Sequence, residues 1–385
     1  MLQPYIPEYR VSFFQESRAL LRDKGFELVL AASRAGGRLA ERGDDRTDLV
    51  ADKVLTSRIV RVGGKPLVIR DLKRVLKEVQ PDLVVAEQAI KNLDTYSLLV
   101  RQTVKGSPRL GLWGQGRAFS TPQGRAGSFV KRQVTLLSDW FFAYTEQGAD
   151  FMVQHGMRRE RVTVLNNTLD TARLRLDLEA VRPEAIEEFR RRHSLVPGRT
   201  ALFLGGVDPS KGIDFLLEVA DKVAEQIPGF RLVIAGMGSS ANQVRHRQSQ
   251  GDPIAYVGRL EGADKAVALR TADILMIPEW VGLVAVDSLV AGCPIVTTVH
   301  PSHSPEFSYL SDRSNAFVFA HDLDAYSGGV VQVMKDPQLL SRVAHQALLD
   351  AYEFSMSRMV ERFAEGVSSW WTSSSNGTDA HVGDI

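Results

Sequence analysis

The chain has few of the features that mark a secreted, membrane-spanning or metal-binding protein. Its 385 residues include one cysteine, Cys293, so an internal disulfide is excluded. Between Gly292 and Pro294, this cysteine is expected to fill core space rather than act as a nucleophile. There is no apolar run of about 18 residues and no signal peptide at the start, so we expect a cytosolic protein in which the sequon at Asn376 is idle. The sequence has no clustered histidine and cysteine set of the zinc type, and we expect neither metal nor cofactor.

The net charge of +1 does not indicate a nucleic-acid partner, but one stretch is strongly unbalanced. Residues 95–138 contain no acidic residue and seven basic ones: Arg101, Lys105, Arg109, Arg117, Arg125, Lys131 and Arg132. Apolar residues lie among them: Leu112, Trp113, Phe119, Phe129 and Val130. Such a stretch suits an anionic membrane face or a phosphate-bearing acceptor such as a polyprenyl diphosphate-linked sugar. A solvated basic face balanced by acidic residues elsewhere explains it equally well.

Length and pattern predict two α/β domains. Strand patterns occur at 27–31, 82–86, 110–113, 140–145 and 162–165, and again at 201–204, 231–235, 255–257, 274–277, 295–298 and 316–318. They alternate with helical patterns, which indicates doubly wound parallel sheets. We expect domains at 1–170 and 199–350, joined by a linker with a charged helix at 171–198. Helices at 351–371 should cross back to the first domain, and 372–385 should be a disordered tail.

The segment 278–298 sets two carboxylates eight positions apart across a loop-to-helix junction. Glu279 follows an apolar strand, and a helix expected to begin near Val284 carries Asp287 and ends at Gly292. Ligands of open α/β sheets bind at the carboxyl ends of strands, and the start of a helix attracts anions. The segment therefore predicts a site for a diphosphate and a sugar. The plainer alternative makes Glu279 a loop residue and Asp287 an ordinary acidic residue of a first helical turn.

This segment resembles the E-x7-E signature of family 4, the retaining glycosyltransferases of GT-B fold. Glu279, Gly282, Leu283 and Val284 match it, and Asp287 stands in place of the second glutamate. The resemblance implies that Glu279 contacts the donor sugar, that the amides at 282–284 contact sugar and phosphate, and that Asp287 binds the ribose.

Two further motifs support the resemblance. The stretch 201–220 is similar to the family's G-R-L-x-x-x-K-G, with Lys211 in place and Gly206 where arginine is expected. The resemblance implies that Lys211 stabilises the departing diphosphate; the alternative is a solvated lysine. Gly236 and Gly238 follow a strand, and Arg259 and Leu260 resemble the loop that borders the nucleotide base. The same glycines fit a dinucleotide fingerprint, but the acidic residue about 20 positions on is absent.

Two loops of the first domain resemble acceptor-side loops of the family. Residues 113–116 read W-G-Q-G where relatives carry W-G-H-G, which places Gln115 near the reacting sugar, beside Trp113 and Arg117. Residues 3–10 read Q-P-Y-I-P-E-Y-R, the mark of a subgroup, and present the acceptor-side candidates Glu8, Tyr9 and Arg10. The alternative for this loop is a turn in which Tyr9 and Arg10 serve packing. Residues 144–146 resemble a strand end that faces the cleft in relatives.

The resemblance implies two Rossmann-like domains facing across a cleft and metal-independent transfer of a hexose with retention. The donor would be a nucleotide diphosphate sugar, and the acceptor a glycan or polyprenyl-linked hydroxyl of polysaccharide or glycoconjugate synthesis. The protein would be cytoplasmic, peripheral at the inner face of the membrane. Two alternatives stay open: a non-catalytic GT-B protein that binds a nucleotide or a partner, and a GT-B epimerase or hydrolase of nucleotide sugars.

Overall fold

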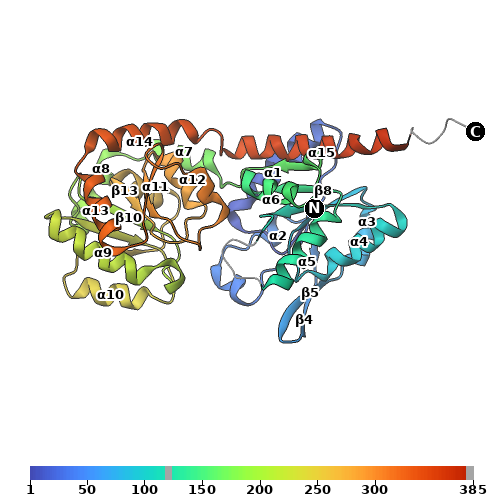
Figure 1. The fold of residues 1–385 in the computed structure, drawn as a ribbon, viewed down its shortest axis with the longest axis horizontal. Helices are drawn as coiled ribbons and strands as arrows, with labels where there is room; N and C mark the ends of the chain where they lie inside the picture. The colour runs from blue at the N-terminus through green and yellow to red at the C-terminus, as the bar shows by residue number, and fades with distance from the viewer. Residues whose placement is uncertain (118–123, 379–385) are drawn as a thin grey trace, which may run out of the picture. The chain divides into compact units, whose positions relative to one another are not determined.

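The computed structural model describes residues 1–117 and 124–378, so Phe119 of the basic stretch lies outside the described residues. The chain divides into two compact units, each built on a parallel sheet (Figure 1). Unit 1 comprises Met1–Asp170 together with Met356–Ile385, and unit 2 comprises Thr171–Ser355.

Unit 1 contains a seven-stranded sheet in the order β3-β2-β1-β6-β7-β8-β9, whose neighbouring strands pair in parallel. Its strands are β1 (Leu2–Gln3), β2 (Ala31–Ser33), β3 (Lys53–Leu55), β6 (Leu83–Glu87), β7 (Arg109–Gly114), β8 (Trp140–Ala143) and β9 (Val162–Val164). Its helices are α1 (Val11–Asp23), α2 (Thr47–Val50), α3 (Leu72–Val79), α4 (Leu93–Lys105), α5 (Arg125–Leu136), α6 (Glu146–Gln154) and α15 (Met356–Thr378). Short 3₁₀ helices span Glu8–Arg10, Gly37–Arg42 and Arg159–Arg161.

Alternate residues of the strands of unit 1 enter two separate cores, as a sheet covered on both faces requires. On β6, Val85 packs in a core with residues of α1 and α15, whereas Val84 and Ala86 pack in the other core with residues of α3, α4 and α6. The first core is rich in aromatic rings: Phe13, Trp113, Phe142, Phe363 and Trp370. These rings hold α15 on the sheet.

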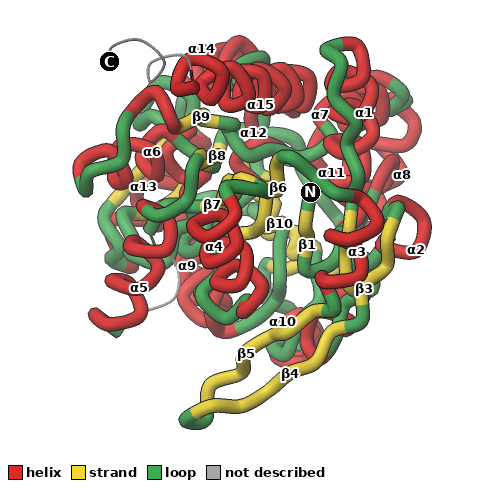
Figure 2. Tube along the Cα trace, turned by 90° about the vertical axis from the view of Figure 1, so that its right-hand side faces the viewer, coloured by secondary structure: helices red, strands yellow, loops and turns green. Residues whose placement is uncertain are grey.

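Unit 1 also carries a hairpin that the strand patterns did not predict. The antiparallel strands β4 (Ser57–Val62) and β5 (Lys65–Arg70) extend away from the sheet in both views (Figures 1 and 2). The base of the hairpin is fixed by a buried ion pair between Arg70 and Asp94 of α4, with 2.7 Å between nitrogen and oxygen. All six residues of β4 are exposed, so no apolar face marks the strand.

Unit 2 contains a six-stranded parallel sheet in the order β12-β11-β10-β13-β14-β15. The strands are β10 (Thr200–Leu204), β11 (Arg231–Ala235), β12 (Ile254–Gly258), β13 (Ile274–Met276), β14 (Ile295–Thr298) and β15 (Ala316–Phe319). The helices are α7 (Thr171–Glu179), α8 (Pro183–His193), α9 (Ile213–Gln226), α10 (Ala241–Ser249), α11 (Gly262–Thr271), α12 (Val284–Ala291), α13 (Leu323–Met334) and α14 (Pro337–Asp350). Short 3₁₀ helices span Pro209–Lys211 and Pro305–Tyr309.

The predicted α/β architecture with two doubly wound sheets is confirmed, and ten of the predicted strands are found within one or two residues. The strand predicted at 27–31 is wrong, because β2 begins only at Ala31. The N–H of Leu30 donates to the carboxylate of Asp52 at 2.7 Å instead of to a neighbouring strand. The apolar residues 28–30 therefore lead into the strand and are not part of its ladder.

Two expectations about the chain's ends and linker need correction. The stretch 171–198 is not a free linker, because α7 and α8 pack against α11 within unit 2. Of the tail expected to be disordered at 372–385, residues 372–378 are helical as the end of α15, and residues 379–385 lie outside the described residues. Trp370 is fully buried in unit 1 and Thr372 bonds the carbonyls of Ser368 and Ser369, so the helix is anchored where the tail was expected to begin.

Candidate donor site at the carboxyl edge of the second sheet

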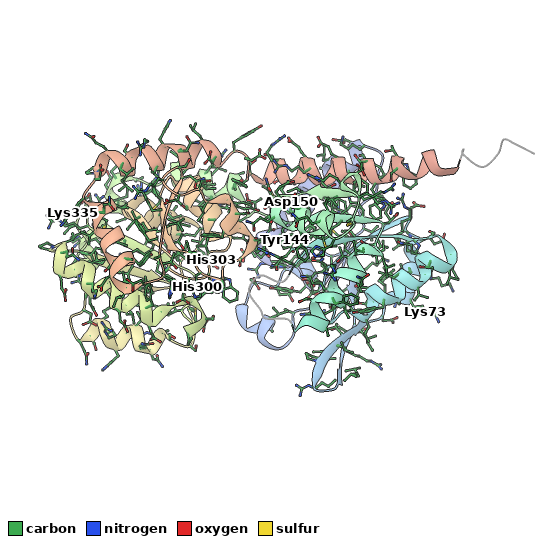
Figure 3. All side chains as sticks on the ribbon, viewed as in Figure 1. Lys73, Tyr144, Asp150, His300, His303 and Lys335 are labelled. Carbon is green, nitrogen blue, oxygen red and sulfur yellow. The ribbon has the colours of Figure 1, made fainter. Side chains whose placement is uncertain are left out.

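The carboxyl ends of four adjacent strands of unit 2 carry the residues of the candidate site. Lys211 lies in the connection after β10, Glu279 follows β13, and His300 and His321 follow β14 and β15. Since neighbouring parallel strands end at the same edge, residues far apart in sequence meet there. Figure 3 labels His300 on the loop after β14, together with His303.

Glu279 and Lys211 are brought together at the start of α9. A Cβ placed on Gly212, the N-cap of α9, would lie 2.6 Å from the Glu279 carboxyl carbon, so the carboxyl group sits against the glycine backbone. Gly212 also has φ +67°, a conformation that favours glycine. The Lys211 ammonium lies 4.0 Å from the centroid of the Trp280 ring. Trp280 itself has φ +51°, which costs energy for a bulky residue and is common at binding sites.

Two histidines that the sequence analysis did not predict lie at this edge. One contacts Glu279, and the rings of the two contact each other. His321 Nε2 lies 2.9 Å from Glu279 Oε1, and its ring stacks on Phe215 at 4.5 Å. The ring of His300 lies 4.6 Å from that of His321. Burial lowers the pKa of His300, although Glu279 acts in the opposite direction. Each is the second residue after the end of its strand, a position that could have identified it.

His303 has a different role, because both of its ring nitrogens are bonded to the backbone. Nδ1 accepts from Val281 N–H at 2.9 Å, and Nε2 lies 2.8 Å from the Thr298 carbonyl oxygen. The ring also stacks on Phe307, and burial lowers its pKa. His303 thus holds the loop after Glu279 in place.

That loop leads into α12, as predicted. Leu283 is the N-cap and has no polar side chain, so the helix has no side-chain cap; the N–H groups of Ala285 and Val286 donate to the carbonyls of Gly282 and Leu283, each at 2.9 Å. Asp287 lies in the first turn, is 7% exposed and forms an ion pair with Lys265 of α11 at 2.8 Å. A Cβ placed on Gly282 would meet nothing closer than the Ser304 hydroxyl oxygen, at 3.6 Å, so there is space beside this backbone for a close approach.

Gly206, Gly236 and Gly238 pack two loops of the sheet edge against each other. A Cβ on Gly236 would overlap the carbonyl oxygen of Gly205, and one on Gly238 would overlap that of Val207. Both glycines are therefore required by close backbone contact, whatever they bind. A Cβ on Gly206 would lie 3.8 Å from Lys211 Cε. The position of the expected arginine thus adjoins the lysine that remains.

Arg259 and Leu260 follow β12 at the same edge of the sheet. The Arg259 guanidinium pairs with Glu261 at 2.5 Å, and its side chain is 45% exposed. Leu260 is half-buried.

In unit 1, the W-G-Q-G loop at the end of β7 is held by Gln88, a residue that the sequence analysis missed. The Gln88 side chain accepts from Gly116 N–H at 3.0 Å and donates to the Gly116 carbonyl at 3.2 Å. A Cβ on Gly148 would lie 2.6 Å from the carbonyl oxygen of Gln115. Gln88 and the start of α6 therefore fix the loop that presents Gln115.

The residues of the loop at 5–10 differ in exposure and in what they contact. Glu8 pairs with Arg46 at 2.7 Å, and Tyr9 is 37% exposed. Arg10, by contrast, is 3% exposed: it donates to the Asn167 side chain, and its guanidinium lies 4.7 Å from the Trp113 ring centroid. Trp113 is 2% exposed. Arg10 is thus packed against Trp113 inside unit 1. This agrees with the alternative hypothesis for the loop, in which Arg10 serves packing.

The basic stretch is not one surface. Arg109 pairs with Asp139 and donates to the Trp370 carbonyl at 3.0 Å, so it fastens α15 to the sheet. Lys131 is 9% exposed and bonds the Arg117 carbonyl at 3.3 Å, and burial lowers the pKa of its ammonium to about 8. Phe129 and Val130 are exposed on α5, beside Arg132. Only part of the stretch is available to a partner.

The remaining candidates have structural contacts in their own units. Tyr144 packs edge-on against Trp113, Thr145 is the buried N-cap of α6, and Glu146 pairs with Arg159 at 3.0 Å. Cys293 is buried, and burial raises the pKa of its thiol, which agrees with a core role. Among the described helices, none has the length and apolar character needed to cross a membrane.

Comparisons with known proteins agree with the resemblance seen in the motifs. Residues 198–336 match the family "Glycosyl transferases group 1". A phosphatidyl-myo-inositol mannosyltransferase of Mycobacterium tuberculosis is 36% identical over 107 residues, which are 26% of this chain and 28% of that protein. The chain therefore matches little more than a quarter of the length of this curated relative.

Solved structures match over nearly the whole chain. Anabaena Alr3699/HepE, solved in complex with UDP, has a TM-score of 0.66 at 15% identity, with 96% of this chain and 98% of that chain covered. UDP-GlcNAc 2-epimerase of Neisseria meningitidis has a TM-score of 0.64 at 13% identity, with 95% and 98% covered. The chain thus has the GT-B fold, and its residues 198–336 match the group 1 glycosyl transferases.

Proposed function

We propose that the protein is a retaining glycosyltransferase that moves a hexose from a nucleotide diphosphate sugar to a hydroxyl of a glycan or lipid-linked acceptor. The observation that carries this proposal is the meeting of two motifs in unit 2. Lys211 and Gly212 belong to one motif and Glu279 and Trp280 to the other, yet the Glu279 carboxyl lies against Gly212 and Lys211 lies on the Trp280 ring. An anion and a cation at adjacent strand ends suit a sugar hydroxyl and a phosphate.

In this proposal, unit 2 binds the donor. Lys211 and the backbone N–H groups at 282–284, which lead into α12, stabilise the negative charge that develops on the diphosphate as the glycosidic bond breaks. Glu279 accepts hydrogen bonds from the sugar hydroxyls and orients the ring. Asp287 binds the ribose, and Lys265, its ion-pair partner, holds the carboxylate in position. Gly236, Gly238, Arg259 and Leu260 border the base.

The proposed reaction needs no protein base. The acceptor hydroxyl attacks from the side of the leaving group, and the departing phosphate takes its proton, so the configuration is retained. Lys211 and the helix amides supply the positive charge that a divalent ion supplies in other transferases, and the transfer is therefore proposed to be metal-independent. Gln115 can donate and accept a hydrogen bond near the reacting sugar but does not titrate.

The acceptor side is proposed to lie in unit 1. Tyr9, Glu8, Gln115 and Arg117 are the candidates with accessible side chains, whereas Arg10 and Trp113 would act by holding their loops. The relative from M. tuberculosis is named for a phosphatidyl-myo-inositol acceptor, and HepE was solved with UDP. We therefore propose a UDP-sugar as the first donor to test, and an anionic lipid-linked acceptor handled at the cytoplasmic membrane face for polysaccharide or glycoconjugate synthesis.

The test is release of nucleoside diphosphate from a panel of UDP-, GDP- and ADP-sugars, first without acceptor and then with a membrane lipid extract. We expect release from one donor to be accelerated by the extract, to resist a chelator, and to fall by about 10²-fold or more in Glu279→Ala. Glu225→Ala is the matched control, because Glu225 is exposed at the far end of α9. Equal rates in the two variants would contradict the proposed role of Glu279.

The same panel separates the alternatives. A nucleotide-sugar epimerase or hydrolase, suggested by the shared fold of the N. meningitidis epimerase, would convert its substrate at full rate without the extract. A non-catalytic binding protein would release nothing from any donor while still binding a nucleotide.

A further inference from the structure

Three side chains with metal-binding atoms converge at the edge of the sheet in unit 2. Glu279, His300 and His321 follow the adjacent strands β13, β14 and β15, and one ligand atom from each lies within 4.8 Å of the other two. The closest pair is Glu279 Oε1 and His321 Nε2, at 2.9 Å. An ion pair explains that contact alone, but it does not explain why a third ligand atom faces the same point.

Two imidazole nitrogens and one carboxylate oxygen form a ligand set of the kind that binds Zn²⁺ with an open fourth position. In a tetrahedral site with bonds of about 2.0–2.2 Å, ligand atoms lie about 3.4 Å apart. The longest side of the triangle, at most 4.8 Å, must therefore contract by up to about 1.4 Å when the ion binds. His321 is the exposed member of the cluster, so its side chain has room to shift towards the other two.

The three side chains are also supported from behind, as metal ligands usually are. His300 Nδ1 lies 2.6 Å from the Ser302 hydroxyl and 3.3 Å from the Ser302 backbone nitrogen, and these contacts hold the ring in place. His321 is stacked on Phe215 with an interplanar angle of 18°. The Glu279 carboxyl rests against Gly212. His303 lies nearby but has both nitrogens bonded to the backbone, so it is not a fourth ligand.

We propose that Glu279, His300 and His321 bind one divalent transition-metal ion, with Zn²⁺ as the best fit. A metal on Glu279 withdraws the carboxylate from the donor sugar. Under the proposed function, on which this second step rests, Zn²⁺ therefore inhibits transfer by competing with the donor, and the transfer itself remains metal-independent.

The direct test is isothermal titration of the full chain with Zn²⁺ after treatment with a chelator. We expect one ion per chain, and no comparable binding of Mg²⁺, which prefers an oxygen octahedron. His300→Ala and His321→Ala should each weaken Zn²⁺ binding by about ten-fold or more. His345→Ala is the matched control, since His345 is exposed on α14 and is not a member of the cluster. Circular dichroism of each variant verifies that it is folded.

A second readout reports the ligand geometry. Co²⁺ bound in place of Zn²⁺ should give intense visible absorption bands of a low-coordinate site, lost in both cluster variants and kept in His345→Ala. Absence of one-to-one binding, or one-to-one binding that survives both substitutions, would overturn the proposal. These measurements use no donor, so their outcome is independent of the proposed transferase activity; competition between Zn²⁺ and a UDP-sugar is then measured only if both hold.

Discussion

The two units use their charged residues differently. In unit 1, Arg10, Arg70, Arg109 and Lys131 are buried or half-buried, and each is engaged with a residue of the same unit. In unit 2, Lys211, Glu279 and His321 gather at the carboxyl ends of the strands and remain partly accessible. A charged residue in this sequence therefore indicates a candidate site only when the fold places it at the carboxyl edge of a sheet and leaves it accessible.

The buried pair of unit 1 offers the strongest test of this contrast. Asp94→Ala removes the partner of the Arg70 guanidinium and of its N–H, and leaves a buried charge uncompensated. We expect a loss of about 3–5 kcal/mol in the free energy of unfolding, measured by urea denaturation. Glu146→Ala breaks the exposed pair with Arg159 and should cost about 1 kcal/mol or less. If the two variants lost the same unfolding free energy, the Arg70 guanidinium would have to be hydrogen-bonded by water or by another residue in Asp94→Ala.

Lys211 tests the opposite half of the contrast. Lys211→Ala should lower the rate of transfer by about 10²–10³-fold, because the cation near the leaving diphosphate is removed. The free energy of unfolding should change little, since the ammonium lies over the Trp280 ring at the sheet edge and not in a core. Lys222→Ala on α9, which breaks an exposed pair with Asp324 of α13, should leave the rate unchanged. A Lys211 variant that loses stability and not rate would make this lysine a structural residue like Arg109.

Gly206→Arg sharpens the comparison by adding the second cation. The Cβ at this position would lie 3.8 Å from Lys211 Cε and 3.2 Å from an Asp208 carboxylate oxygen, which must shift by a few tenths of an ångström. The guanidinium would then extend beside Lys211 towards the phosphate proposed there. We expect nucleoside diphosphate to bind about ten-fold more tightly, by calorimetry. Gly206→Gln adds bulk without charge and should not have this effect. Unchanged affinity in the arginine variant would place the phosphate elsewhere.

The sequence predicts the second unit better than the first, for a physical reason. Strands buried on both faces, such as β10, β11 and β14, read as short apolar runs, and each was predicted. The hairpin β4–β5 was missed because an exposed hairpin has no core-facing pattern. Within the candidate site, Glu279, Lys211 and the start of α12 were predicted from their motifs. His300 and His321 were not, although each follows a predicted strand end, and neither was Gln88 of the W-G-Q-G loop in unit 1, because the contacts of these residues join segments far apart in sequence.

The smallest expected effect concerns His303 of unit 2. Like the buried basic residues of unit 1, it is bonded to residues of its own unit. Burial lowers the pKa of His303 in the folded protein, so the unfolded chain binds more protons as the pH falls. The contribution of its neutral ring to stability is complete above the unfolded pKa of about 6.5 and decreases as the pH is lowered from there towards the folded pKa. His303→Gln should therefore flatten the dependence of the unfolding free energy on pH below about pH 6.5. The flattening is partial, because burial also lowers the pKa of His193 and His300. Exposed His345 provides the control as His345→Gln, and equal pH slopes for the two variants would show that the backbone bonds of His303 are replaced by water on unfolding without a change in proton binding.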